Sequence, residues 1–317
     1  MSIRTLVAAL LLSTQAAWAQ YPSRSIRLIV PFPPAGATDI VGRIVAQKLS
    51  DQLGQSVVVE NRPGAGGTLG SDLAAKAAPD GYTLLIATTS THSIGPVLQK
   101  LPYDPIRDFA PITQVADIPN ILVVSPKLPV KNLQEFIALA RSQPGKLNYS
   151  SSGIGTIVHL NGELFKLVAK VDLVHVPYKG TQLAIPDLAS GSVAMMVDNL
   201  ASALPNIHSG NARPLALEAA QRSPLLPEVP TFAEAGMPEF DLLTWFGMFA
   251  PAGTPPEIVA RLQREIAAGL KAPDVAERFA AVGAEPVGSP PAQFVERIRH
   301  DSAKWAEVIK AANIKAH

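Results

Sequence analysis

Cysteine is absent from this 317-residue sequence, so disulfide bonds and thiol nucleophiles are excluded. A surplus of either charge is absent as well, because 27 Lys and Arg residues face 26 Asp and Glu residues and give a formal net charge of +1. Proteins that bind nucleic acids through the phosphate backbone carry clustered basic residues. We therefore expect a globular protein that has no nucleic-acid partner and is held together by its apolar core.

Signatures of catalysis and of cofactor binding are lacking too. The six histidines show no metal-ligand spacing, and no serine lies in a nucleophile elbow. The stretch Gly64-Ala65-Gly66-Gly67 invites comparison with a dinucleotide-binding fingerprint, but that motif needs glycine where the chain has Leu69. The sequence thus predicts neither a metal nor an organic cofactor. A Ser-His-Asp set assembled from distant segments stays open, because such sets are recognised by geometry.

Long apolar runs are confined to the N-terminus. Residues 1–19 contain one basic residue, an apolar stretch at 6–12 and the small-x-small sequence Ala17-Trp18-Ala19, which together are typical of a cleaved secretory signal peptide. The alternative, a membrane anchor, needs about 20 consecutive apolar residues, far more than this stretch has. We expect cleavage after Ala19, secretion, and a soluble mature protein that starts at Gln20.

The remaining sequence alternates between strand-like and helix-like segments. This pattern is typical of an α/β protein with largely parallel sheets flanked by helices. Strands are predicted at residues 26–30, 57–60, 84–87, 173–176, 193–197 and 215–217, and a β-like run at 146–149 leads into the turn at 150–156. Helices are predicted at residues 38–53, 132–142 and 156–168, and after Pro255 and Pro290.

Two apolar extended stretches, residues 118–124 and 243–250, interrupt this alternation. We interpret them as crossovers between two domains, because the mature chain is longer than a usual single domain. The first domain is then discontinuous, with residues 20–118 plus 246–317, and the second comprises residues 119–245. Two crossing strands form a hinge about which the domains can close on a ligand.

Two turns rich in Gly and Ser or Thr, residues 31–39 and 150–156, each follow a predicted strand and open a helix. Unpaired backbone N–H groups and the positive end of the helix dipole meet at such a turn, which suits an anion. The turns lie in different predicted domains. We therefore expect them to face a shared cleft that holds a small carboxylate.

Six motifs carry a resemblance to a known family: VPFPPAGATD (30–39), VENRPGAGG (59–67), PDGYTLL (79–85), SSGIGTIVHL (151–160), VPYKG (176–180) and VPTFAEAG (229–236). With these motifs the chain resembles the Bug-type periplasmic solute receptors of tripartite tricarboxylate transporters. The resemblance implies the two-domain fold of type II periplasmic binding proteins, with two crossover strands and a central ligand cleft. It also implies a periplasmic location, no catalysis, and the membrane subunits of such a transporter as partners. We expect the receptor to be a monomer.

The candidate ligand-binding residues lie in the two turns and at the strand ends beside them. They are Phe32, Ala35, Gly36, Asp39, Thr88, Thr89, Ser152, Gly153, Gly155, Thr156, His159, Tyr178 and Asp198. The resemblance implies that the first turn holds a ligand carboxylate with ordered water, although Ala35 stands where the family usually has glycine. Hydroxyls and amides of the second turn suit another carboxylate. The simpler interpretation of each turn is a helix cap, which Thr38 or Asp39 would form in the first turn. The simpler interpretation of His159 is a structural pairing with Glu163, four residues later on the same helix face.

Two charged residues bear on which class of ligand the cleft favours. Asp198 ends a predicted strand beside the cleft and would repel a carboxylate, which favours amino or hydroxy acids. Lys179 is either a cation in the cleft or a solvated side chain. The sequence predicts an extracytoplasmic receptor that binds a small carboxylate in the interdomain cleft and delivers it to a transporter. A hydrolase or isomerase acting on a carboxylated substrate in that cleft, and a periplasmic ligand sensor, stay open as alternatives.

Overall fold

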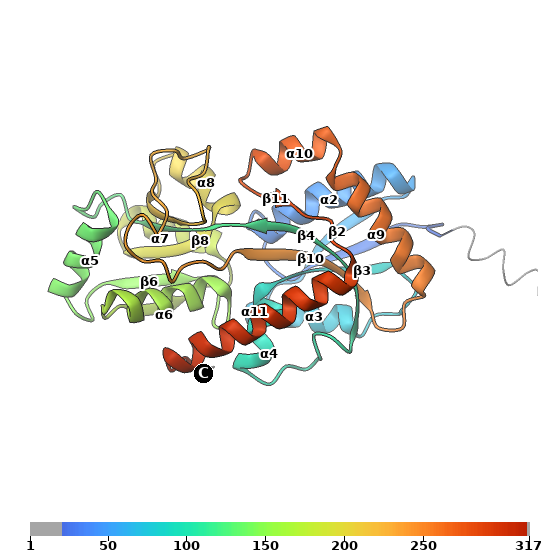
Figure 1. The fold of residues 1–317 in the computed structure, drawn as a ribbon, viewed down its shortest axis with the longest axis horizontal. Coiled ribbons are helices and arrows are strands. Elements are labelled where there is room, and N and C mark those ends of the chain that lie inside the picture. Colours follow the sequence, from blue (N-terminus) through green and yellow to red (C-terminus); the bar gives the residue numbers. More distant parts are fainter. Residues whose placement is uncertain (1–20, 316–317) are drawn as a thin grey trace, which may run out of the picture.

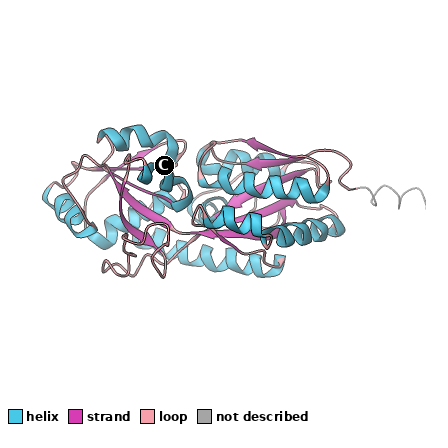
Figure 2. Cartoon of the chain, turned by 90° about the horizontal axis from the view of Figure 1, so that it is seen from above, coloured by secondary structure: helices cyan, strands magenta, loops and turns pink. Residues whose placement is uncertain are grey.

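The computed structural model describes residues 21–315, so the predicted signal peptide lies outside the described residues. The chain forms two α/β lobes, each built around one sheet, that lie end to end along the long axis of the molecule (Figure 1). A view at right angles again shows the lobes side by side (Figure 2). Between residues 21 and 315 no helix is both long and apolar enough to cross a membrane.

The larger sheet is mixed, with strands in the order β11-β4-β10-β3-β1-β2. Its strands are β1 (Ile26–Val30), β2 (Val57–Asn61), β3 (Thr83–Thr88), β4 (Phe109–Ile118), β10 (Thr244–Pro251) and β11 (Glu285–Pro286). β1 pairs in parallel with β2 and β3, as the alternating pattern predicts. β10 runs antiparallel to both β3 and β4, and β11 runs antiparallel to β4. The prediction of a largely parallel sheet is wrong here, because β10 returns from the other lobe and enters the sheet from its opposite end.

The smaller sheet repeats this arrangement, with strands in the order β7-β6-β8-β5-β9. Its strands are β5 (Asn120–Val124), β6 (Asn148–Ser151), β7 (Val174–Pro177), β8 (Met195–Asn199) and β9 (Arg213–Glu218). β6 pairs in parallel with β7 and β8, whereas β5 is antiparallel to β8 and β9. Again the strand that arrives from the other lobe, β5, breaks the parallel pattern.

Both crossovers consist of extended chain. β4 of the larger sheet ends at Ile118, and β5 of the smaller sheet begins at Asn120, so the predicted stretch 118–124 spans two strands that meet at Pro119. Proline lacks the N–H group that a strand needs to continue its ladder, which explains the break. The chain returns through β10, close to the predicted stretch 243–250. The predicted domain boundaries, 20–118 with 246–317 and 119–245, stay a prediction.

Helices cover both sheets, and short helical turns join them to strands. The helices are α2 (Ala37–Leu53), α3 (Thr68–Ala75), α4 (Gly95–Leu98), α5 (Leu133–Ser142), α6 (Ile157–Ala169), α7 (Ile185–Ser190), α8 (Leu200–His208), α9 (Pro256–Leu270), α10 (Pro273–Ala280) and α11 (Pro291–Ala311). The turns are η1 (Ala65–Gly67), η2 (Ser90–Ile94) and η3 (Thr181–Ala184). The predicted helix at 132–142 is confirmed as α5, because the Asn132 side chain accepts the N–H of Glu135 and caps it. Sequence periodicity missed α4, α7, α8 and α10, which are short.

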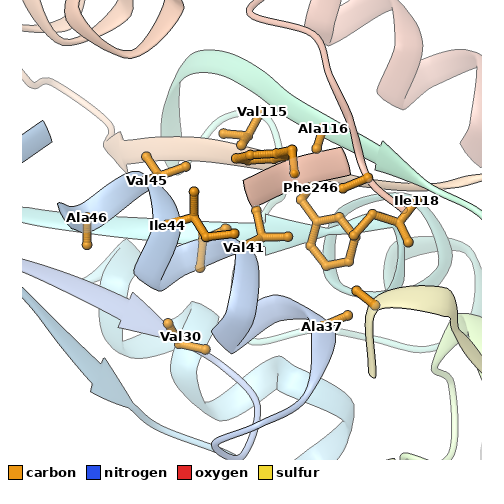
Figure 3. Packing of buried hydrophobic residues seen from close by; sticks show 14 of the residues in the cluster. Val30, Ala37, Val41, Ile44, Val45, Ala46, Val115, Ala116, Ile118 and Phe246 are labelled. Carbon is orange, nitrogen blue, oxygen red and sulfur yellow. The ribbon is translucent and has the colours of Figure 1, made fainter. Parts of the chain in front are cut away.

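The helix that opens at the first turn is packed on the larger sheet and on α9. The apolar face of α2, with Val41, Ile44 and Val45, belongs to one buried cluster with Val115 of β4 and Phe246 of β10 (Figure 3). All five side chains are buried. Burial of this kind stabilises a helix far more than its intrinsic propensity does. The start of α2 is therefore held at a fixed position beside the hinge.

The C-terminal helix α11 spans both lobes (Figure 1). Near its start, the Phe294 ring packs against Trp245 and Phe249 of β10, with ring centroids 5.1 Å apart in each pair. Near its end, Trp305 is fully buried in a cluster with Ile157 and Val158 of α6. One helix thus packs on the hinge strand of one lobe and on the first turn of α6 in the other.

We predict that Trp305→Ala lowers the free energy of unfolding by about 3 kcal/mol, because it removes a large buried side chain at the junction of the lobes. Urea denaturation followed by circular dichroism measures the change. Glu307→Ala, on an exposed face of the same helix, is the control and should stay within about 0.5 kcal/mol of the wild type. Equal, small effects of the two substitutions would contradict the bridging role of α11.

Candidate functional site

A cavity of about 180 Å³ lies between the two sheets, where the two Gly-rich turns meet the crossover strand β10. Its walls are Phe32, Pro33, Pro34, Gly36, Ala37, Thr38, Thr88, Ser90, Ser152, Ile157, Val158, Gly180, Thr181, Gln182, Leu183, Asp198, Asn199, Thr244 and Phe246. Pockets for drug-sized ligands measure roughly 300–1,000 Å³, so this cavity suits a smaller molecule. Among the described residues, those that form its walls include no Lys, Arg or His.

Helix starts from both lobes supply the positive potential that side chains do not. Residues 36–38 open α2 on one side of the cavity, and residues 157–158 open α6 on the other. Residues 180–182, at the start of η3, form part of the wall on the α6 side. N–H groups at a helix start lack intrahelical partners, and the helix dipole adds a positive partial charge. Helix starts of this kind can stabilise an anion without a cationic side chain.

The first turn is held in shape by the Asp39 carboxylate. This group accepts hydrogen bonds from the Ala35 N–H (3.0 Å), from Arg43 Nε (2.9 Å) and from Asn61 Nδ2 (2.9 Å). Burial opposes ionisation of Asp39, but the hydrogen bonds from Arg43, Asn61 and Ala35 outweigh it and lower the pKa. Ala35 itself has φ of 63°, a left-handed conformation that costs a non-glycine residue some strain. Asp39 and Ala35 lie behind the cavity wall and position it.

The predicted cap of α2 is wrong in detail. The N-cap residue is Gly36, in an extended conformation, and neither Thr38 nor Asp39 occupies that position. Asp39 instead reaches back from the first turn of the helix to the N–H of Ala35, one residue before the cap. This contact satisfies a backbone donor outside the helix, and the N–H groups at the helix start have no side-chain cap.

The second turn is ordered by its own hydroxyl and backbone groups. Thr156 Oγ1 donates to the Gly153 carbonyl at 2.7 Å, and the Gly155 N–H donates to His159 Nδ1 at 3.3 Å. Gly153 and Gly155 have φ of 129° and 79°, values that L side chains rarely adopt. Thr156 is the N-cap of α6, although its side chain caps no helical N–H. Of this turn, Ser152 lines the cavity.

His159 supports the second turn from inside α6. Its ring stacks on His175 with centroids 4.2 Å apart, and burial lowers its pKa to about 4. A neutral ring can accept the Gly155 N–H through Nδ1, as the geometry requires. The pairing of His159 with Glu163 that the sequence suggested is not formed, because Glu163 accepts hydrogen bonds from Tyr149 and Lys166 instead.

The candidate residues divide by position. Phe32, Gly36, Thr88, Ser152 and Asp198 line the cavity. Those outside its walls are Ala35, Asp39, Thr89, Gly153, Gly155, Thr156, His159 and Tyr178. Their roles in ligand binding stay predictions.

Two of the residues outside the walls make contacts that explain their positions. Thr89 is buried, and its Oγ1 accepts the N–H of Trp245 in β10. The Tyr178 hydroxyl donates to Asp187. Both side chains therefore engage neighbouring elements.

Asp198 is the charged side chain in the wall. It is 1% exposed, and burial raises its pKa to about 7, against the opposing effect of hydrogen bonds that include the N–H of Asn199 at 2.8 Å. A carboxyl group in this setting is poorly solvated when ionised. Its presence makes the cavity polar without making it cationic.

Sequence reasoning missed Asn199, which connects the cavity wall to both crossover strands. Its Nδ2 donates to Asn120 Oδ1 (2.6 Å) and to Thr244 Oγ1 (2.8 Å), and Thr244 Oγ1 donates to Asn120 Oδ1 (2.9 Å). Asn120 begins β5 and Thr244 begins β10. Asn120 also donates to the buried Glu218 at 2.6 Å, whose pKa burial raises to about 8. The signal available in the sequence was the position of Asn199 directly after Asp198 at a strand end.

One serine–histidine pair bears on the enzyme alternative. Ser151 Oγ lies 2.7 Å from His175 Nε2. Ser151 is fully buried and does not line the cavity, and the His175 ring is stacked between Tyr149 and His159. A nucleophile must reach its substrate, so this pair is better explained as support for the second turn.

Comparisons with known proteins place the chain among solute receptors. Residues 41–314 match the family described as tripartite tricarboxylate transporter family receptor. BugT of Bordetella pertussis (strain Tohama I) is 42% identical over 297 residues, which cover 93% of this chain and 91% of that protein.

Solved structures agree over nearly the whole chain. The periplasmic binding protein BugD superposes with a TM-score of 0.90 at 35% identity, covering 94% of this chain and 100% of that one. A protein of R. palustris solved with adipate gives 0.90 at 39% identity, with 93% and 99% covered. MatC from Rhodopseudomonas palustris with bound malate gives 0.86 at 35%, with 91% and 100% covered. The predicted fold class, that of two-domain periplasmic binding proteins, is confirmed.

The first prediction from this site concerns Asp198 and pH. Because the folded state raises the pKa of Asp198 to about 7 from 3.8, its ionisation destabilises the fold increasingly as pH rises through that interval. Asp198→Asn should therefore gain stability over the wild type, by little at pH 4 and by a few kcal/mol at pH 8. Urea denaturation of the ligand-free proteins measures the difference. Asp274→Asn, at an exposed site paired with Lys48, should show no such gain, and a constant difference for Asp198→Asn would contradict the account.

The second prediction concerns the hydrogen bonds of Asn199. Thr244→Val keeps the shape of the side chain but removes the hydroxyl that joins Asn120 and Asn199, so the half-buried Asn199 amide loses one acceptor and the buried Asn120 Oδ1 loses one donor. We expect a loss of about 1–3 kcal/mol in the free energy of unfolding. We also expect weaker binding of any ligand that requires closure. An unchanged denaturation midpoint in urea would show that these hydrogen bonds do not hold the crossovers together.

Proposed function

This chain belongs to the tripartite tricarboxylate transporter receptor family, and from that membership we propose that it binds a small carboxylate between its lobes and delivers it to the membrane subunits of such a transporter. The observation that carries the proposal is the cavity itself. Helix starts from both lobes form its walls, and none of its described wall residues is cationic. A small anion is the ligand that this arrangement favours.

Aliphatic dicarboxylates are the ligand class that we propose. One relative was solved with adipate and another with malate. The wall of this cavity combines apolar side chains such as Phe32 and Phe246 with hydroxyls such as Thr88 and Ser152. A carbon chain with a carboxylate at its end matches that combination of surfaces.

Binding is coupled to closure because the ligand meets both lobes at once. In this structure the lobes already touch: Ser90 of η2 accepts the N–H of Ile157 at the start of α6, at 3.0 Å. A ligand shifts a hinge equilibrium only by its differential affinity for the closed state. Contacts to the first turn of α2 and to Ser152 at the same time provide that difference.

The proposal extends to the location, the oligomeric state and the domain boundaries of the protein. We place the mature receptor in the periplasm, after removal of residues 1–19, as a monomer with domains 20–118 plus 246–317 and 119–245. It delivers its ligand chemically unchanged, and the Ser151–His175 pair, which lies outside the cavity wall, does not act on it. The membrane subunits receive the closed, ligand-bound receptor rather than a reaction product.

The proposal is tested with a thermal-shift screen of the mature protein against small carboxylates, followed over hours by mass spectrometry of each compound. At a hundred times its dissociation constant, a ligand adds roughly 2.7 kcal/mol of stability and raises Tm by a few degrees. We expect a selective shift with the compound unchanged. Consumption of the compound would make the protein an enzyme, and the absence of a shift with every carboxylate would overturn the ligand class.

A further inference from the structure

A second cavity, of about 360 Å³, shares part of its wall with the first. Phe32 and Ser152 belong to the walls of both. We call the cavity that contains Asp198 the inner cavity and the second one the outer cavity. One lobe contributes residues 64–67 and Gln99 to the outer cavity, and the other contributes residues 152–154 and 177–179. A molecule that extended past Phe32 and Ser152 would therefore remain between the lobes.

The glycine-rich stretch that failed as a nucleotide-binding motif forms one wall of the outer cavity. Gly64, Gly66 and Gly67 have φ of 143°, 63° and 95°, so the backbone adopts conformations that favour glycine along this wall, where Ala65 contributes a methyl group. A Cβ atom on Gly66 would lie 2.9 Å from the carbonyl oxygen of Ile154 in the other lobe. The lobes thus approach each other closely at this point, and this contact bounds the outer cavity. The close approach explains why residue 66 is glycine.

The charges of the two cavities differ. Lys179 is the charged residue in the outer wall, and among the described residues no Asp or Glu accompanies it there. Its side chain is exposed, and its ammonium group makes no ion pair within residues 21–315. The neighbouring Tyr178 hydroxyl donates its hydrogen to Asp187, so it does not also donate to a bound anion. The inner cavity contains the buried Asp198 instead.

We propose that the outer cavity is a subsite for the far carboxylate of an α,ω-dicarboxylate, with Lys179 as its countercharge and the near carboxylate in the inner cavity. This inference rests on the proposed function. Two carboxylates crowded into the inner cavity would repel each other and Asp198, whereas the outer cavity separates them. The structure thereby assigns to Lys179 the role of a cation in the cleft, one of the two interpretations that its sequence position allowed.

The expected contribution of Lys179 is modest, because its ammonium group is exposed. Exposed ion pairs contribute little, so we expect a gain of about fivefold in affinity for a ligand that bears the far carboxylate. The gain should fall as ionic strength rises, since salt screens exposed charges. Ligands too short to pass Phe32 and Ser152 should gain nothing.

The test is isothermal titration calorimetry with matched pairs of acids that differ only in the far carboxylate: succinate with butyrate, adipate with hexanoate, and suberate with octanoate. Each pair is measured on the wild type, on Lys179→Gln, on Lys179→Arg and on Lys146→Gln. Lys146 is an exposed lysine of the same lobe that lies outside both cavities, so its substitution is the matched control. We expect the longer diacids to bind the wild type about fivefold more tightly than their monoacids.

Lys179→Gln should abolish that preference and leave the affinity for the monoacids unchanged, while Lys179→Arg and Lys146→Gln should keep it. An equal loss for monoacids and diacids in Lys179→Gln would show that Lys179 acts on closure or folding, and would overturn the subsite. An unchanged preference in that variant would overturn it as well. If no acid of either kind bound the wild type, the proposed function itself would fail, which is a different outcome from all of these.

Discussion

The side-chain amide of Asn199 is the contact on which the arrangement of the molecule depends. It hydrogen-bonds to the first residue of each crossover strand, Asn120 and Thr244, and it forms part of the cavity wall. The hinge and the cavity wall therefore share one half-buried polar group, whose two acceptors, Asn120 and Thr244, are themselves buried. The cavity wall and the hinge are therefore in direct contact through this side chain, with no element between them.

The electrostatics of the cavity follow from what surrounds this contact. The starts of α2 and α6 both lie in the wall of the cavity, and Asp198 precedes Asn199 at the end of β8. Backbone N–H groups and helix dipoles attract an anion without the desolvation that a buried lysine or arginine would require. Asp198 limits how much negative charge the inner cavity accepts, and the outer cavity with Lys179 lies where excess charge can be placed.

The sequence predicted the local elements better than their assembly. The strand at 26–30, the helix at 38–53 and the Asn132 cap depend on periodicity and capping chemistry, and these are confirmed. The mixed sheets depend on the direction from which β5 and β10 arrive, which no local pattern records.

The candidate site shows the same division. Phe32 and Ser152 follow predicted strands and line the cavity, as strand ends in an α/β sheet should. Asn199 ends β8 beside Asp198, a position that the sequence could have indicated, whereas Thr244 is brought to the wall by the crossover strand β10 and is revealed by the tertiary structure. For the first turn, the sequence suggested Thr38 or Asp39 as the helix cap. The fold instead uses the Asp39 carboxylate to hold Ala35 and Asn61, because the helix begins earlier than expected.

The measurement that tests the central claim most directly is small-angle X-ray scattering and calorimetry of the mature protein with adipate and with its uncharged diamide. We predict that adipate binds one to one and makes the protein more compact, and that the diamide does neither. Equal binding of the diamide, or binding of adipate without compaction, would contradict an anion held between closing lobes.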